Sequence, residues 1–181
     1  MIAIDAPRLR LRPFEPADLM PLHGMLTDPN VTWFMPELAM ADLDATRAFL
    51  RRAMESCASP VSLHMILAVA ERDGAAVGGV CLNFTDGLPG NAHWSLGYFI
   101  RAGRWGRGYA TEAVGAALNW LFRHGAYRVS ASALAENLAS RRVLEKNGFI
   151  QEGLLVRSRW HDGQWRDCAV YRLLREEHAE D

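Results

Sequence analysis

Apolar residues along this chain follow two different spacings, which divide it into strands and helices. Runs or alternations of apolar residues predict strands at 8–12, 64–70, 76–84, 92–100, 127–133, 149–159 and 164–174. Apolar residues that recur every three or four positions predict helices at 18–27, 41–56, 111–124 and 137–147. Strands and helices mixed along the whole length predict one α/β domain.

Glycine and proline mark the boundaries between these elements. His-Asp-Gly at 161–163 predicts a hairpin between the last two strands. Gly78 and Gly79 predict a bulge or a close approach of another backbone. Residues 85–91 are predicted to form a loop. The apolar segment 31–40 is predicted to be irregular, and it would contact a ligand, cover the core or form a dimer contact.

Composition narrows the class of protein. The 181 residues carry 20 basic and 21 acidic side chains, a net charge of −1 that gives no general attraction to nucleic acid. Three widely spaced cysteines form neither a disulfide framework nor a zinc pattern. No apolar run approaches the ~20 residues that span a bilayer. We therefore expect one cytoplasmic domain over residues 1–181, its core at about 7–175, with no metal, membrane or nucleic-acid partner.

A glycine-rich stretch just before a predicted helix is the most informative segment. Glycines at 103, 106 and 108 let the backbone approach a ligand closely, and the helix that follows begins with amides that have no intrahelical partner. This combination predicts an anion site made from the main chain, although a capped surface loop is the alternative. The stretch is neither a Walker loop nor a regular dinucleotide fingerprint. Further positive charge would come from Arg101, Arg104 and Arg107.

Three segments in this order resemble the GNAT acyltransferases: LGYFI at 96–100, WGRGYATEA at 105–113 and NLASRRVLEKNGF at 137–149. RLRLR at 8–12 and the segment 167–174 fit the branch typified by ribosomal-protein alanine and serine N-terminal acetyltransferases. The resemblance covers nearly the whole chain. It implies a six- or seven-stranded mixed sheet flanked by helices, with a splay between two parallel central strands.

The same resemblance implies acetyl-CoA as cosubstrate. The backbone of Tyr98, Phe99 and Ile100 would pair with the pantetheine amides, and the amide of Phe99 or Ile100 would stabilise the oxyanion. Asn137 would hydrogen-bond the pantetheine arm. The residues expected around the pyrophosphate are Trp105, Gly106, Arg107, Gly108, Tyr109 and Ala110, with Trp105 standing where the family often has Gln or Arg.

Direct attack of an amine on a thioester needs a base for the amine proton and a hydrogen bond to the departing thiolate. Ser140 is expected to supply that hydrogen bond. Many relatives have a glutamate where this chain has Ser95, and a serine cannot replace a carboxylate base. His93 lies on the same strand face as Ser95 and titrates in the right range, so it could act through a water held by Ser95. Glu136 is the other candidate base.

The sequence therefore predicts an N-acetyltransferase acting on a primary amine, with a protein N-terminus as the first acceptor and a small amine or antibiotic as the rival. A second class of function is a CoA-binding sensor or scaffold without catalysis. It remains an alternative because Ser95 stands where many relatives have a glutamate. A third is a nucleotide-phosphate enzyme using the same glycine loop. The protein would be a monomer or a homodimer.

Overall fold

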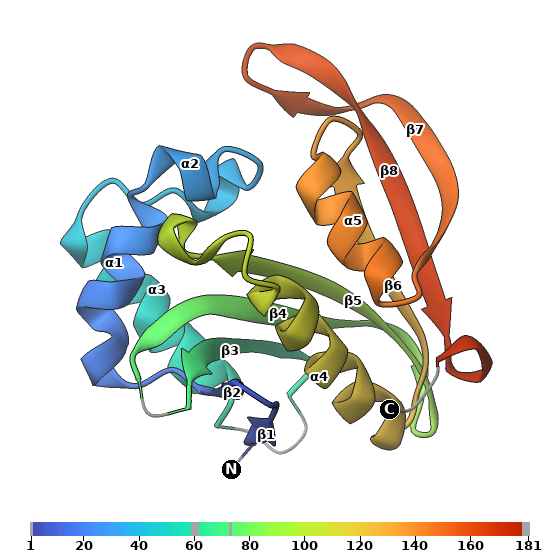
Figure 1. Ribbon diagram of the computed structural model, residues 1–181, viewed down its shortest axis with the longest axis horizontal. Coiled ribbons are helices and arrows are strands. Elements are labelled where there is room, and N and C mark those ends of the chain that lie inside the picture. Colours follow the sequence, from blue (N-terminus) through green and yellow to red (C-terminus); the bar gives the residue numbers. More distant parts are fainter. Residues whose placement is uncertain (1, 59–61, 73, 179–181) are drawn as a thin grey trace.

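A computed structural model describes residues 2–58, 62–72 and 74–178, and within them eight strands form one mixed sheet (Figure 1). The strand order is β1-β2-β3-β4-β5-β6-β8-β7, and among these strands only β5 and β6 pair in parallel. All seven predicted strands are present, and two-residue β1 brings the sheet to one strand more than the resemblance implied. The strands are β1 Ile4–Asp5, β2 Leu9–Pro13, β3 His64–Glu71, β4 Ala76–Leu88, β5 Asn91–Ile100, β6 Ala126–Leu134, β7 Ile150–His161 and β8 Gln164–Leu174.

The helices begin where a polar side chain or a glycine can end the preceding loop. Asp42 and Asn137 cap α3 and α5 by accepting hydrogen bonds from backbone amides three residues on. No described helix is long and apolar enough to cross a membrane. The helices are α1 Leu19–Leu26, α2 Pro29–Thr32, α3 Leu43–Ser56, α4 Tyr109–Arg123 and α5 Leu138–Lys146, with short 3-10 turns η1 Pro16–Asp18, η2 Pro36–Leu38, η3 Ala102–Arg104 and η4 Arg175–Glu177.

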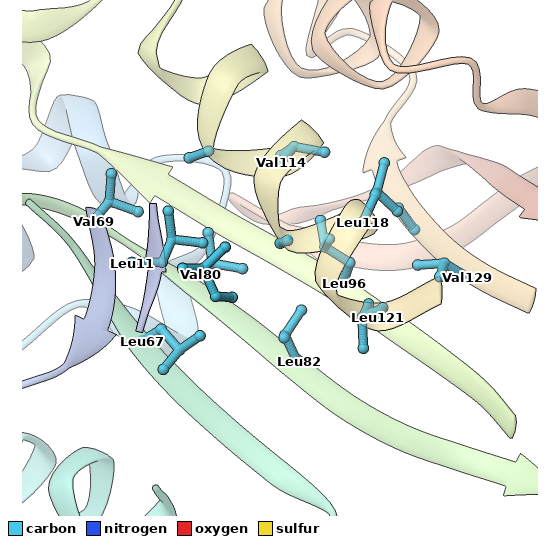
Figure 2. Packing of buried hydrophobic residues seen from close by; sticks show 14 of the residues in the cluster. Leu11, Leu67, Val69, Val80, Leu82, Leu96, Val114, Leu118, Leu121 and Val129 are labelled. Atoms are coloured by element: carbon cyan, nitrogen blue, oxygen red, sulfur yellow. The ribbon is translucent and has the colours of Figure 1, made fainter. Parts of the chain in front are cut away.

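The sheet separates two apolar cores. Successive strand residues point to opposite faces, so Leu67 and Val69 of β3 enter the core under α4, whereas Ile66 and Ala68 enter the core with α1 and α3. Figure 2 shows how the α4 residues lie over the sheet in the first of these cores. Full burial stabilises each such side chain by about 1.5–3 kcal/mol. This packing fixes the course of α4 across the sheet and therefore the position of its first turn.

The parallel pair β5 and β6 separates part of the way along. Their register ends at the pair formed by Ser95 and Ser130. Beyond it, β5 continues to Ile100 along β4, and β6 continues to Leu134 along β8. The expected splay between the two central strands is therefore present, and it leaves one edge of each strand without its neighbour.

The structure contradicts one local prediction and confirms another. Residues 85–91 are not a loop, because β4 extends to Leu88 and β5 resumes at Asn91 after a tight turn. At Gly78 and Gly79 the close approach is present: an added Cβ would lie 2.3 Å from the Phe99 carbonyl oxygen at the first position and 2.6 Å from the Phe99 ring at the second. A register shift between β3 and β4 lies just beside this pair.

A buried ion pair ties β2 to the start of the first helical segment. The Asp18 carboxylate is almost fully buried and accepts hydrogen bonds from the Arg12 guanidinium at 2.7 and 3.0 Å and from the Glu15 amide at 2.9 Å. Burial alone would raise the pKa of Asp18, but these hydrogen bonds outweigh it and leave that pKa below its ordinary value.

Replacing Asp18 with Asn should therefore reduce the free energy of unfolding by about 3 kcal/mol near pH 7, because Arg12 would lose its buried partner and keep only the exposed Glu15 carboxylate at 3.6 Å. The carboxylate pKa is lower in the folded chain, so this stabilisation is present above the ordinary pKa and is lost as the pH falls through the folded value. Urea unfolding across pH measures it. Asp44→Asn breaks an exposed pair with Arg47 and should change stability little; equal losses would contradict the assignment.

Candidate active site

A cleft of about 1260 Å³ lies where β5 and β6 separate. Most of the site residues predicted from the sequence line it. Arg101, Glu136 and Arg107 do not, and the Arg107 carbonyl accepts a 2.9 Å hydrogen bond from Arg8. The structure therefore brings residues from three separate sequence segments to one place. The predicted residues in the lining are His93, Ser95, Tyr98, Phe99, Ile100, Trp105, Gly106, Gly108, Tyr109, Ala110, Asn137 and Ser140.

The first turn of α4 presents unpaired amides to this cleft. Within the described chain, no hydrogen bond is donated by the backbone N–H groups of residues 106–111; the first donated bond runs from Glu112 to the Gly108 carbonyl at 3.0 Å. Gly108 caps the helix in the left-handed region, with φ of 79°, and offers no side chain. The positive end of the helix dipole adds to these donors, and the geometry suits an anion. Arg101 and Arg107 are exposed in the same loop.

Side chains from distant elements hold this loop in place. Glu71 at the end of β3 accepts hydrogen bonds from Arg104 at 3.0 and 3.2 Å and from the Tyr109 hydroxyl at 2.8 Å, and these bonds lower the pKa of its carboxyl. The Trp105 indole donates a 2.7 Å hydrogen bond to the Ile100 carbonyl. Arg104 is therefore neutralised inside the protein and does not add the free positive charge expected of it.

Beyond the point where β6 separates, every second peptide group of β5 points away from β4 and toward the cleft. The amide of Arg101 donates to Val77 of β4 at 2.8 Å. Because alternate residues of a strand point the same way, the Phe99 amide also faces β4, and the amides of Tyr98 and Ile100 face the side where β6 has moved away. The expected oxyanion donor is therefore Ile100 or Tyr98 rather than Phe99.

The side chain of Tyr98 was not among the sequence-based candidates, which used only its backbone. Its hydroxyl lies 2.8 Å from the Ser140 hydroxyl and 3.1 Å from the Ser140 carbonyl. Burial raises the pKa of Tyr98 to about 12, with the Ser140 hydrogen bond opposing the shift. The side-chain oxygen of Asn137 accepts a hydrogen bond from the Ser140 amide at 3.1 Å. The side-chain nitrogen of Asn137 has no partner among the described residues.

On the other face of β5, His93 bonds across to β6. Its Nε2 lies 2.9 Å from the Ser130 hydroxyl. Burial lowers the pKa of His93 and the nearby Arg128 guanidinium lowers it further, whereas Asp86 and Glu152 oppose the shift. His93 is therefore a neutral imidazole at physiological pH, able to accept a proton.

The hydrogen bond that Ser95 accepts leaves its hydroxyl hydrogen free to donate. The Asn83 side-chain nitrogen donates to its hydroxyl oxygen at 3.5 Å, and the Asn83 side-chain oxygen bonds to the His64 ring. An amide nitrogen can only donate and an amide oxygen can only accept, so the Ser95 hydroxyl hydrogen stays available to the cleft. This direction favours Ser95 as a hydrogen-bond donor toward a bound molecule and disfavours it as a base.

The structure also places Glu136 and the irregular segment 31–40 relative to the cleft. Glu136 lies outside the cleft lining and pairs with Arg166 at 2.9 Å, so the structure does not bring it to the site. Phe34 and Met35 of the irregular segment line the cleft. No cluster of three or more metal-ligating side chains lies within the part of the chain that is described.

Side chains of the β7–β8 hairpin contact the α2–η2 segment beside the cleft. His161 packs edge-on against Trp33 with ring centroids 5.1 Å apart, and Arg159 pairs with Glu37 at 3.1 Å. Arg159 and Glu37 also line the cleft, so this contact borders one side of it. The apolar part of this side consists of Val31, Phe34, Met35, Leu38, Met40 and Phe49.

Comparisons with known proteins agree with this arrangement. A family model for the acetyltransferase (GNAT) domain matches residues 8–150. The chain is 28% identical to the uncharacterized N-acetyltransferase p20 of Bacillus licheniformis, over 95% of this chain and 96% of that protein. Its structure is similar to that of Mycobacterium smegmatis RimJ in complex with CoA-disulfide, with a TM-score of 0.83, 26% identity and coverage of 99% and 89% of the two chains.

A more distant solved structure has the same fold. The spermidine N-acetyltransferase of Vibrio cholerae, in complex with CoA and spermine, has a TM-score of 0.77 and 20% identity, covering 94% of this chain and 97% of that one. At that identity the likeness concerns the fold alone. With the family model matching most of its length, this chain belongs to the GNAT family and is an acetyl-CoA-dependent N-acetyltransferase.

Proposed function

We propose that this enzyme acetylates the N-terminal amine of a peptide or protein by direct attack of that amine on acetyl-CoA. The observation that carries the proposal is the cleft at the β5–β6 separation, which joins the unpaired amides of residues 106–111 to an apolar acceptor side. The resemblance of its motifs to those of N-terminal acetyltransferases supports this acceptor over others.

The charges on the acceptor side favour a peptide end over a polyamine. Glu37 and Glu152 are the carboxylates among the cleft-lining residues described. Glu37 pairs with Arg159 at 3.1 Å, and Glu152 pairs with Arg128. A polycation would have to compete with these arginines for its counter-charge. A peptide terminus carries one amine and apolar neighbours, which suits the surrounding side chains.

The residues present fit CoA. The amides of residues 106–111 would hold the pyrophosphate, and the free edge of Tyr98 and Ile100 would pair with the pantetheine amides. The side-chain nitrogen of Asn137 can donate to the same arm. Acetyl-CoA supplies the activated acetyl group as a thioester. The Ile100 or Tyr98 amide would stabilise the negative charge that develops on the thioester oxygen.

Direct attack is favoured over a cysteine intermediate. Cys81 is the thiol in the described cleft lining, and burial together with the Glu37 carboxylate raises its pKa to about 11. A thiol in that state stays protonated near neutral pH and is a poor nucleophile. The amine therefore attacks the thioester itself. His93 takes the amine proton, through a water to which Ser95 donates a hydrogen bond.

The departing thiolate faces two linked hydroxyls. Ser140 would donate a hydrogen bond to the sulfur, and Tyr98 would donate to the Ser140 oxygen in turn. The Tyr98 pKa of about 12 lies well above that of a thiol, about 8.5, so Tyr98 keeps its proton. The pair thus stabilises the thiolate by hydrogen bonding without protonating it. Tyr98 is a positioning residue, since it acts through Ser140.

The proposed function is tested by thiol release from acetyl-CoA with a panel of N-terminal peptides, polyamines and aminoglycosides. Turnover with peptides above the other amines is expected. CoA binding without turnover on any acceptor would favour the scaffold alternative.

Gly108→Val should weaken CoA binding at least ~10-fold, because Val is strained at positive φ and would displace the amides. Gly103→Val, where φ is not positive and the space is open, is the matched control.

Ser140→Ala should lower kcat by about 10- to 100-fold while CoA affinity changes less than about twofold, because the lost hydrogen bond acts on developing charge. Tyr98→Phe should lower kcat by a smaller factor. The double variant should resemble Ser140→Ala, since Tyr98 acts through Ser140. Steady-state kinetics and CoA titration separate the two effects. Equal losses of kcat and affinity would instead mean that the hydroxyls only hold α5 in place.

The proton-accepting role of His93 predicts a pH profile. Activity requires the neutral ring, so kcat/KM should fall as the pH drops through a His93 pKa that lies below the ordinary histidine value. Arg128→Gln removes a positive charge and frees Glu152, and both changes raise that pKa. The acidic limb and the NMR titration of the His93 ring should then move together to higher pH. Arg51→Gln, on the outside of α3, should move neither the acidic limb nor the ring titration. If the acidic limb of Arg128→Gln stays in place while its ring titration moves, His93 is excluded as the base.

A further inference from the structure

One part of the cleft runs from the separation of β5 and β6 across β4 and β3 toward α3. Its floor consists of two cross-strand rows, one polar and one with little polarity, in which residues paired across neighbouring strands share one face of the sheet. The rows are Ser95, Asn83 and His64, and Gly97, Cys81 and Ile66, and all six residues line the cleft. A side chain added at Gly97 would meet no atom within 4 Å, so the floor is open beside the separation.

Arg52 lies at the α3 end of this part of the cleft. Phe49 and Arg52 are three residues apart on α3, so they lie on the same side of the helix, and both line the cleft. Phe49 is buried in the same core as Ile66, whereas Arg52 is exposed. Arg52 has no hydrogen-bond or ion-pair partner among the described residues. It therefore presents an uncompensated positive charge to a molecule in this part of the cleft.

That charge lies on the side of the sheet opposite to α4. Helix α4 packs on one core of the sheet and α3 on the other. The unpaired amides of residues 106–111 belong to the α4 side, so the pyrophosphate of the proposed cosubstrate complex lies away from Arg52. Two other lining arginines, Arg128 and Arg159, already pair with Glu152 and Glu37. Arg52 is therefore placed to meet an anionic group of the acceptor.

The distance across the strands indicates which part of a peptide reaches Arg52. Neighbouring strands lie about 4.8 Å apart, so β3 lies about 10 Å from β5. In the proposed mechanism the attacking amine lies within one water of Ser95 on β5. An extended peptide advances about 3.3 Å per residue, which brings its third or fourth residue over β3, next to α3.

We propose that Arg52 binds an acidic side chain at the third or fourth residue of the acceptor peptide, so that the enzyme prefers N-termini followed by an acidic residue. This rests on the proposed function, in which a peptide N-terminus attacks acetyl-CoA. A guanidinium matches a carboxylate in both charge and hydrogen-bond geometry. Because Arg52 is exposed, the preference should weaken as salt is added.

The test compares kcat/KM for ten-residue peptides that carry aspartate, asparagine or lysine at the third or at the fourth position. The unmodified enzyme should favour aspartate over asparagine by about fivefold at low salt at one of these positions, and lysine should be the poorest. A peptide with asparagine at both positions and aspartate at the ninth has the same net charge as the aspartate peptides. It should behave like the asparagine peptide, because its charge lies beyond Arg52.

Variants of two neighbouring arginines on α3 assign the preference to one side chain. Arg52→Gln should make the aspartate and asparagine peptides equal, and Arg52→Glu should reverse the order so that lysine is favoured. Arg51 lines a separate hollow beside Leu19 of α1, so Arg51→Glu should keep the original preference.

The outcomes separate this inference from the proposed function. Peptides acetylated without an acidic preference, a preference that survives in Arg52→Glu, or an equal loss for all peptides in Arg52→Gln would each overturn the inference alone. If no peptide is acetylated while another amine is, the proposed function fails together with the inference.

Discussion

The separation of β5 from β6 after the pair Ser95 and Ser130 is the constraint on which the site depends. Each strand remains fully paired on its other side, β5 with β4 and β6 with β8, so neither can follow the other. Backbone groups on the open edge of β5 must then find water or a ligand, because unpaired buried peptide groups are costly. A ligand with its own amides can take the place of the missing strand, which explains why an extended pantetheine arm suits this gap.

The anion site depends on the same geometry but is held by other contacts. The α4 amides can point into the cleft only if the glycine loop before them is fixed. Glu71 of β3 and Arg8, the residue before β2, supply that restraint: Glu71 binds Arg104 and Tyr109, and Arg8 pairs with Glu112 at 2.7 Å. Of the charged side chains in the loop, Arg104 is thus engaged in holding the structure, whereas Arg101 and Arg107 are exposed. In the proposed function, the main chain of residues 106–111 would then bind the pyrophosphate.

Much of the fold could be predicted because it follows from local patterning. Period-two alternation located seven strands, and glycine boundaries located α4 and α5 within two residues. The error at 85–91 has a physical reason: this end of β4 is exposed, so its residues carry no apolar alternation even though they pair with β5. In the site, motif residues could be placed from their local spacing. The bonds from Tyr98 to Ser140 and from His93 to Ser130 could not, because each depends on the distance between elements far apart in the chain.

The serine at position 95 alters how proton transfer must work in this enzyme. A carboxylate there would accept the amine proton directly, whereas Ser95 is too weak a base for that role, and the hydrogen bond it accepts from Asn83 leaves its hydroxyl hydrogen free to donate. In the proposed mechanism the accepting role passes to the next residue on the same strand face, His93, whose pKa is lowered by burial and by Arg128. With acetyl-CoA bound as proposed, donors would face the thioester oxygen and the sulfur, and one acceptor would face the amine. That division matches the charges that develop as an amine displaces a thiolate, with negative charge on oxygen and sulfur and positive charge on nitrogen.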